Sequence, residues 1–191
     1  MPELDAYAED CRLSGLAELG DGRLTDYLNA TDELDLEAVR LESLEDGRLV
    51  EAGDVGVATD ELCAVVAVGP RGDPARRLRT MTTRVEVRLG PYRVVGMVHG
   101  TPASDPLAAA LRRATWLPLT EATVTYRRAG DEITDEIETL IVNRSLATLF
   151  RAIEDEVATL PWEESRPEKV ERSRGVDLTA WTGYEDFPPP R

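Results

Sequence analysis

Apolar positions follow the same order twice along the chain, about 80 residues apart. The first set is Leu24, Leu28, Leu34, Leu36 and Leu41, and the second, 83 positions later, is Leu107, Leu111, Leu117, Leu119 and Val124. Arg12-x-x-Gly15 precedes the first set, and Arg93-x-x-Gly96 precedes the second at an offset of 81. Because an ordered pattern that recurs at a nearly constant offset is typical of an internal repeat, the sequence predicts two diverged copies of one β-rich unit.

Each copy predicts the same succession of elements. A first strand with alternating apolar positions covers Cys11 to Leu19 in one copy and Val85 to His99 in the other. A short amphipathic helix follows, with apolar residues at i, i+3 and i+4: Leu24, Tyr27 and Leu28, then Leu107, Ala110 and Leu111. A strand and a glycine-bearing turn follow, and in the first copy this turn is Glu45-Asp46-Gly47. A long apolar segment completes each copy, and its middle predicts a turn or kink, at Thr59-Asp60-Glu61 in the first copy. The order per copy is therefore β-α-β-β.

A sheet of three or four strands with one helix leaves an apolar face that needs a second layer. The other copy is the natural cover. We therefore expect an α+β protein in which two β-α-β-β repeats pack with pseudo-two-fold symmetry, as a sandwich or a small barrel, with an extended C-terminal tail. The expected segments are a first repeat unit, 1–70, a basic linker, 71–83, a second repeat unit, 84–160, and a tail, 161–191.

The net charge of −15 limits the choice of partners, because an acidic surface repels phosphate backbones. It argues against nucleic acid and suits a basic protein partner, while a homo-oligomer stays open. No apolar run reaches the roughly 18–20 residues that a membrane-spanning helix needs, and the acidic N-terminus lacks a signal pattern. We therefore expect a cytoplasmic protein without membrane contact. Adaptation to high salt is another reading of the acidity.

The sequence offers little catalytic chemistry. His99 is the only histidine, and neither cysteine belongs to a metal-binding or redox motif. No phosphate-binding glycine motif occurs. We therefore expect no cofactor, no metal and no catalytic residue. An enzyme that uses His99 with Asp105 is the weaker alternative, since the arrangement suggests no particular reaction.

Two segments outside the repeats carry candidate binding residues. The basic cluster in the linker predicts either an anion site or a solvated linker that offsets the acidic first unit, and consists of Arg71, Arg76, Arg77 and Arg79. The tail concentrates aromatic residues that can anchor on a partner or on the protein's own domain, namely Trp162, Trp181, Tyr184 and Phe187.

The motifs resemble those of a small uncharacterised bacterial β-rich domain family. In that family a strand with R-x-x-G precedes a helix start R-L-x-D-x-L-N, and a final hairpin ends near V-N-R. The first copy has the helix motif at residues 23–29, ending in Asn29, and the second has Val142-Asn143-Arg144. Each copy thus keeps a different half of the pattern over residues 10–150. The final hairpin is also similar to that of Sm-like barrels, where an asparagine-bearing turn can bind RNA, but the acidic charge argues against that function.

The preferred prediction is a non-catalytic accessory or assembly subunit that binds another protein through its duplicated domain and its tail. The alternative is a regulatory protein that senses a small ligand or nucleotide between the two repeats, near Arg12 and Arg93.

Overall fold

The computed structural model describes residues 1–20, 22–68, 81–100, 106–112 and 115–153. All of them belong to one compact unit, Met1–Asp155. The basic linker residues 71–80 and the tail 161–191 lie outside the described residues. The predictions for Arg71, Arg76, Arg77, Arg79, Trp162, Trp181, Tyr184 and Phe187 therefore stay predictions.

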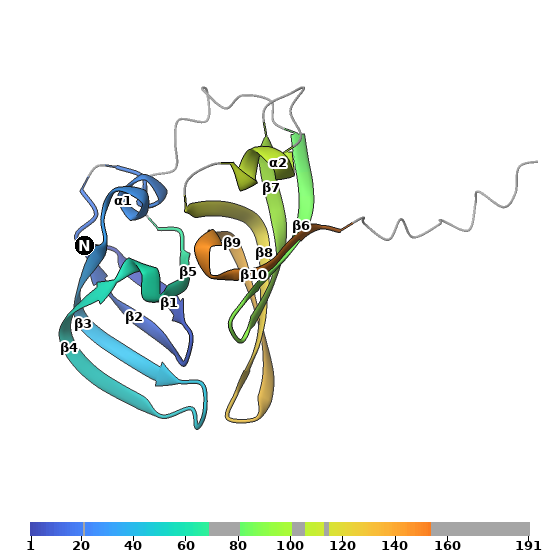
Figure 1. Ribbon diagram of the computed structural model, residues 1–191. Helices are drawn as coiled ribbons and strands as arrows, with labels where there is room; N and C mark the ends of the chain where they lie inside the picture. The colour runs from blue at the N-terminus through green and yellow to red at the C-terminus, as the bar shows by residue number, and fades with distance from the viewer. Residues whose placement is uncertain (21, 69–80, 101–105, 113–114, 154–191) are drawn as a thin grey trace, which may run out of the picture. The chain divides into compact units, whose positions relative to one another are not determined.

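The two halves of this unit contain the same succession of elements (Figure 1). The first half consists of β1 (Glu3–Ala8), β2 (Cys11–Ala17), α1 (Leu24–Ala30), β3 (Glu33–Ser43), β4 (Leu49–Ala58), the 3-10 turn η1 (Thr59–Glu61) and β5 (Leu62–Val66). The second consists of β6 (Met81–Leu89), β7 (Tyr92–Gly100), α2 (Pro106–Leu111), β8 (Trp116–Arg128), β9 (Asp131–Asn143), the 3-10 turn η3 (Arg144–Leu146) and β10 (Ala147–Ala152).

The predicted α+β class with β-α-β-β repeats is wrong. Strands hold 68% of the described residues, which contain only two α-helices, and each half has the order β-β-α-β-β-β. The error arose at the start of each half, where a hairpin stands in place of one strand. In the second half the chain reverses at Gly90, whose φ of +51° lies in the left-handed region that glycine tolerates. In the first half the acidic strand β1 was missed.

All ten described strands form a single antiparallel sheet, in the order β10-β6-β7-β8-β9-β5-β1-β2-β3-β4. The two halves meet where β5 pairs with β9, through Ala64 with Val142, Val65 with Ile141 and Val66 with Leu140. The fifth strand of one half thus pairs with the fourth strand of the other. A two-fold axis would instead bring the same patch of both halves together, so the predicted pseudo-two-fold packing is also wrong. The halves are joined head to tail, and β4 and β10 form the edges of the described sheet (Figure 1).

The glycine of the Arg-x-x-Gly motif has the same structural reason in both halves. The strands beside Gly15 and Gly96 each contain a bulge with a residue at positive φ, Ala38 at 51° and Glu121 at 50°. A Cβ atom at Gly15 would lie 3.0 Å from Val39 Cγ2, and one at Gly96 would lie 3.2 Å from Leu119 Cβ. The bulge therefore brings the neighbouring strand too close for a side chain at the glycine.

Each half contributes side chains to the hydrophobic core of the other. The core of the first half includes Trp116 and Ile141 from the second half. The core of the second half includes Tyr7 and Ala64 from the first half. The helix α1 buries Leu24 and Leu28, one turn apart, in the first core. Because the cores are shared, the two halves form one folding unit.

Candidate functional site

Three tyrosines and an arginine form a cluster where the two halves meet. The ring centroids of Tyr7, Tyr92 and Tyr126 are 5.2 to 6.1 Å apart, with edge-on or tilted planes. The Arg12 guanidinium carbon lies 5.1 Å from the Tyr7 ring centroid and 5.8 Å from that of Tyr126. Both distances are in the range of a cation–π contact. We call Tyr7, Arg12, Tyr92, Tyr126 and Asp135 the junction cluster.

Polar groups of the junction cluster are bonded to one another. Arg12 Nη1 donates a hydrogen bond of 2.9 Å to Tyr126 Oη and lies 3.6 Å from Asp135 Oδ2. Tyr7 Oη donates to the same carboxylate oxygen over 3.1 Å. Burial raises the pKa of Tyr7 and of Tyr126, so both phenols stay neutral at pH 7. The Arg12 charge is paired inside the protein, which gives no support to a ligand site at this residue.

Two asparagine side chains also join the halves. Asn29 in α1 accepts a hydrogen bond of 3.1 Å from Trp116 N and donates one of 3.3 Å to Trp116 O. Asn143 at the end of β9 is buried and donates to Leu62 O over 3.1 Å and to Thr59 O over 3.5 Å. The motif halves that the two copies retain therefore both lie at this junction. The equivalent positions in the opposite halves carry other residues. Arg112 in the second half is equivalent to Asn29, and Thr59 in the first half is equivalent to Asn143.

Arg93 lies elsewhere, on the outer face of the strands β10, β6 and β7. Its neighbour Tyr92 points into the junction cluster, and successive side chains of a strand point to opposite faces. Arg93 Nε donates a hydrogen bond of 2.7 Å to Glu86 Oε1. Arg151 Nη2 lies 2.6 Å from Glu86 Oε2, and Arg88 Nη2 lies 3.5 Å from Glu86 Oε1. Arg12 and Arg93 are thus not brought together, and each has its own partners.

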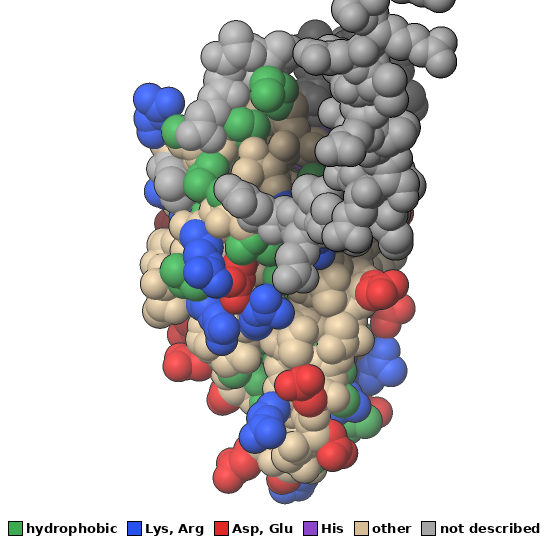
Figure 2. Space-filling view, turned by 90° about the vertical axis from the view of Figure 1, so that its right-hand side faces the viewer, with side chains coloured by type: hydrophobic (Ala, Val, Ile, Leu, Met, Phe, Trp, Pro, Cys, Tyr) green, Lys and Arg blue, Asp and Glu red, His purple; other side chains and the backbone are tan. Residues whose placement is uncertain are grey.

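We call Glu86 with Arg88, Arg93 and Arg151 the arginine face. The arginine side chains are 52%, 46% and 60% exposed, while that of Glu86 is 3% exposed. Hydrogen bonds from Arg93 and Arg151 lower the pKa of Glu86 to about 2, so this carboxylate is ionised at pH 7. It neutralises one of the three arginine charges, and the face keeps a net charge of +2. Figure 2, which looks at this side of the molecule, shows basic side chains gathered around an acidic one.

Sequence reasoning missed three of the four residues of this face. The spacing Glu86-x-Arg88 within a predicted strand indicates that the two side chains lie on the same face, because residues two apart in a strand share a face of the sheet. Arg93 follows across the hairpin, where it pairs with Arg88. Arg151 had no local signal, because only the pairing of β10 with β6 sets it opposite Glu86.

The strand β10 that carries Arg151 has one strand neighbour, β6, among the described strands. Ile153 N donates to Arg84 O over 2.9 Å, so it points toward β6. Successive backbone N–H groups of a strand alternate in direction, so those of Phe150 and Ala152 point to the open edge. Leu149 pairs with Arg88 and is 36% exposed on the same face as Arg151. The edge thus presents backbone donors beside an apolar and a basic side chain.

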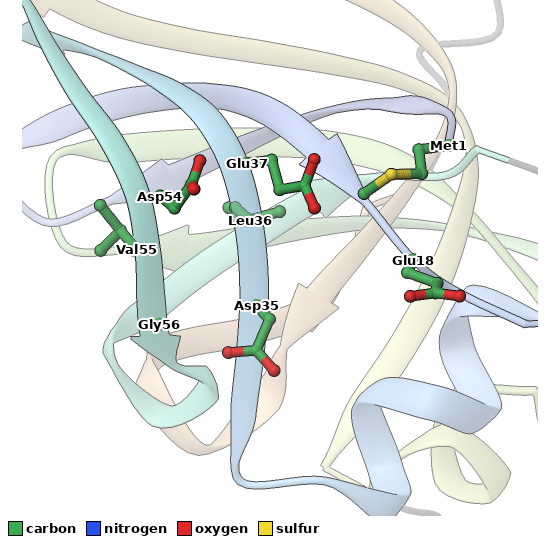
Figure 3. A pocket seen from close by; sticks show the side chains of 8 residues that line it. All are labelled: Met1, Glu18, Asp35, Leu36, Glu37, Asp54, Val55 and Gly56. Carbon is green, nitrogen blue, oxygen red and sulfur yellow. The ribbon is translucent and has the colours of Figure 1, made fainter.

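The opposite edge has a different character. A cleft of about 370 Å³ beside β4 is lined by Met1, Glu18, Asp35, Leu36, Glu37, Asp54, Val55 and Gly56. Figure 3 shows carboxylates of β3 and β4 at this cleft. Ala38 N donates a hydrogen bond of 3.2 Å to Asp54 Oδ1, so the Asp54 carboxylate stabilises the bulge of β3. Among the described residues no group of three or more histidine, cysteine or carboxylate side chains is arranged to hold a metal ion.

The remaining candidate residues show no catalytic arrangement in the described part of the chain. His99 Nε2 lies 2.7 Å from Thr120 Oγ1, and Asp105 is outside the described residues. Burial raises the pKa of Cys11 and of Cys63 to about 11, so neither thiol is an activated nucleophile at pH 7.

No described helix has the length and apolar character needed to cross a membrane. Comparison with protein-family models, curated proteins and solved structures finds no match to this chain. The two sheet edges and the arginine face are the candidate binding surfaces among the described residues.

Proposed function

We propose that this protein is a non-catalytic assembly subunit that binds an extended segment of another protein along the open edge of β10. The observation that supports this most directly is the position of β10 in its half. It follows the same 3-10 turn and pairs with the same first strand as β5 does in the other half. The outer edge of β5 binds the strand β9, whereas the outer edge of β10 has no described strand. Strand addition to such an edge is a common mode of peptide recognition.

The edge of β10 is better suited to this role than that of β4. The pairing of β4 with β3 is interrupted by two register shifts, and Gly53 in β4 has a φ of +74°. Irregularity and charge at an edge strand, here with Glu51 and Asp54, are devices that prevent strand pairing. The pairing of β10 with β6 is continuous from Leu149 to Ala152.

A second copy of the chain is a poorer occupant, although symmetry would set its β4 against β10. In the first half Val65 pairs with Ala6. In the second half Phe150 pairs with Val87, which lies 81 residues after Ala6. Val65 is therefore equivalent to Phe150, and Val66 is equivalent to Arg151. Val66 packs against the core of the second half, but Arg151 is charged and bonded to Glu86. Both junction asparagines are also replaced, by Arg112 and Thr59. These replacements favour a different protein as the partner.

The test uses peptides selected from a displayed random library against the full-length protein, with amide hydrogen exchange as the readout. We expect bound peptides to slow exchange at Phe150 and Ala152, while the inward-facing amide of Arg151 exchanges slowly with or without peptide. The variant Ala152→Pro removes an outward donor and should weaken binding at least about tenfold.

The matched control is Ala58→Pro at the other edge. Thr59 N donates to Asp32 O, so the preceding Ala58 N–H points outward, and the φ of Ala58 is −64°, which suits proline. This variant should bind the peptides as the wild type does. If selected peptides protect other amides, or if Ala152→Pro binds them normally, the proposal is wrong. Slow exchange at Phe150 and Ala152 in the free protein, relieved in a variant that ends at Ile153, would assign the edge to residues 154–191 and also overturn it.

A further inference from the structure

We infer that the segment bound by β10 is acidic, with a carboxylate opposite Arg151 and an apolar side chain two residues away opposite Leu149. This inference rests on the proposed strand addition and names the chemistry of the partner. It follows from which side chains an added strand would meet on the outer face of the sheet.

The register of β10 decides those neighbours. Leu149 pairs with Arg88, and Arg151 pairs with Glu86. Both β10 residues therefore lie on the outer side of the sheet, the side that carries the arginine face. An added strand would lie about 4.8 Å from β10, and side chains directly opposite one another in paired strands have Cβ atoms about 4.5–5.5 Å apart. A carboxylate opposite Arg151 would thus be in ion-pairing range. An apolar residue two positions away on the same face would cover the exposed side of Leu149.

The charge around Arg151 is available to such a carboxylate. Glu86 uses one carboxylate for three arginines, and Arg151 and Arg88 each remain more than half exposed. Arg88 lies on β6, one strand further from the open edge, and its charge adds to the positive potential there. A lysine or arginine opposite Arg151 would meet a like charge, which disfavours basic segments.

An acidic protein fits this face better than a nucleic acid does. The protein carries a net charge of −15, so a polyphosphate backbone extending beyond the arginine face would meet repulsion. The exposed large apolar side chains among the described residues include no aromatic ring on which a base could stack. A short acidic segment needs only the +2 charge of the arginine face.

The probe is a fluorescein-labelled peptide of about nine residues, a typical strand length at the upper end. Threonine occupies every second position, and valine and glutamate alternate at the positions between. Two sister peptides carry glutamine or lysine in place of glutamate. We expect the glutamate peptide to bind the full-length protein about three- to tenfold more tightly than the glutamine peptide, and the lysine peptide to bind most weakly. The preference for glutamate should shrink as salt rises.

The test variants are Arg151→Gln and Arg88→Gln, with Arg40→Gln as the matched control. Arg40 is an exposed arginine of β3 that pairs with Glu3, far from β10 in the strand order. The first two variants should bring binding of the glutamate peptide close to that of the glutamine peptide, and the control should leave it unchanged. Binding of the glutamine peptide should be unaffected in all three.

The outcomes separate this inference from the proposed function. If Ala152→Pro abolishes binding of every peptide while Arg151→Gln and Arg88→Gln change nothing, strand addition stands and the acidic partner is refuted. If the arginine variants weaken binding but Ala152→Pro does not, the acidic preference stands without strand addition. If a labelled single-stranded oligonucleotide binds more tightly than the glutamate peptide at physiological salt, the partner class is wrong.

Discussion

Replacement of Asn143 by alanine is the most direct test of how the two halves are held together. The side chain is buried and joins both halves, because Nδ2 donates to the carbonyls of Leu62 and Thr59 while Oδ1 accepts from Ser145 N over 3.1 Å. Alanine leaves the Leu62 carbonyl and the Ser145 N–H without this partner. A buried polar group that loses its partner costs about 1–3 kcal/mol. Leu62 is buried, whereas Ser145 is exposed and its N–H can bind water instead, so we expect the free energy of unfolding to fall by about 1–3 kcal/mol.

The assay is urea denaturation of the full-length protein at pH 7, followed by far-UV circular dichroism. A loss of this size is a large fraction of the roughly 5–15 kcal/mol that stabilises a typical domain. Thr148→Ala is the matched control, since Thr148 makes one exposed hydrogen bond of 3.4 Å to Arg88 O. Its effect should stay within about 0.5 kcal/mol.

Asn143→Asp adds a dependence on pH. The new carboxyl keeps the acceptor for Ser145 but turns an oxygen toward the Leu62 and Thr59 carbonyls. Burial among acceptors raises the pKa of this group in the folded state, so the folded protein binds a proton more tightly than the unfolded chain, and stability rises as pH falls. If Asn143→Ala unfolds within about 0.5 kcal/mol of the wild type, or if the aspartate variant shows no such trend, the asparagine does not hold the junction.

Three further predictions concern single side chains. Gly15→Ala should lower the free energy of unfolding by about 1–3 kcal/mol, because its Cβ would crowd the bulge, whereas Gly22→Ala, with no atom within 4 Å, should be close to neutral; thermal melts of both variants check this. The pKa of Glu86 is lowered from 4.5 to about 2, so its contribution to stability is present above pH 4.5 and is lost as pH falls toward 2. The difference in unfolding free energy between wild type and Glu86→Gln, measured by urea titration, should therefore shrink over that pH range. A constant difference would contradict the ion pairs. Tyr126→Phe removes the acceptor of the 2.9 Å bond from Arg12 and should cost about 0.5–1.5 kcal/mol, measured by urea denaturation. An unchanged midpoint would mean that this hydrogen bond does not contribute to stability.

Several elements could be read directly from local patterns. The apolar spacing of Leu24 and Leu28 predicted the helix α1, and Glu45-Asp46-Gly47 predicted the turn between β3 and β4, where Gly47 has a φ of 71°. The turn expected at Thr59-Asp60-Glu61 corresponds to η1. These features succeed because a helix face or a tight turn is encoded within a few neighbouring residues.

The hairpins at the start of each half were missed for an equally local reason. The strand β1 alternates acidic with apolar residues, and its acidic side obscured a strand that buries Leu4 and Tyr7. In the second half, Gly90 and Pro91 interrupt a long alternating segment, and the turn was read as part of one strand. Both errors changed the count of strands and with it the predicted architecture.

The sequence by itself determined the recurring apolar pattern, the turns and the helix α1, because these depend on contacts between residues close in the chain. It also singled out Arg12, Arg93 and the asparagine motifs without their partners. Tertiary structure decided that Arg12 is paired with Asp135 and that Arg93 joins Arg151 around Glu86. It also decided that the halves join head to tail and leave β10 at an edge. Strand order depends on pairings between residues far apart in sequence, and one chain's local pattern carries no record of which strand lies beside which.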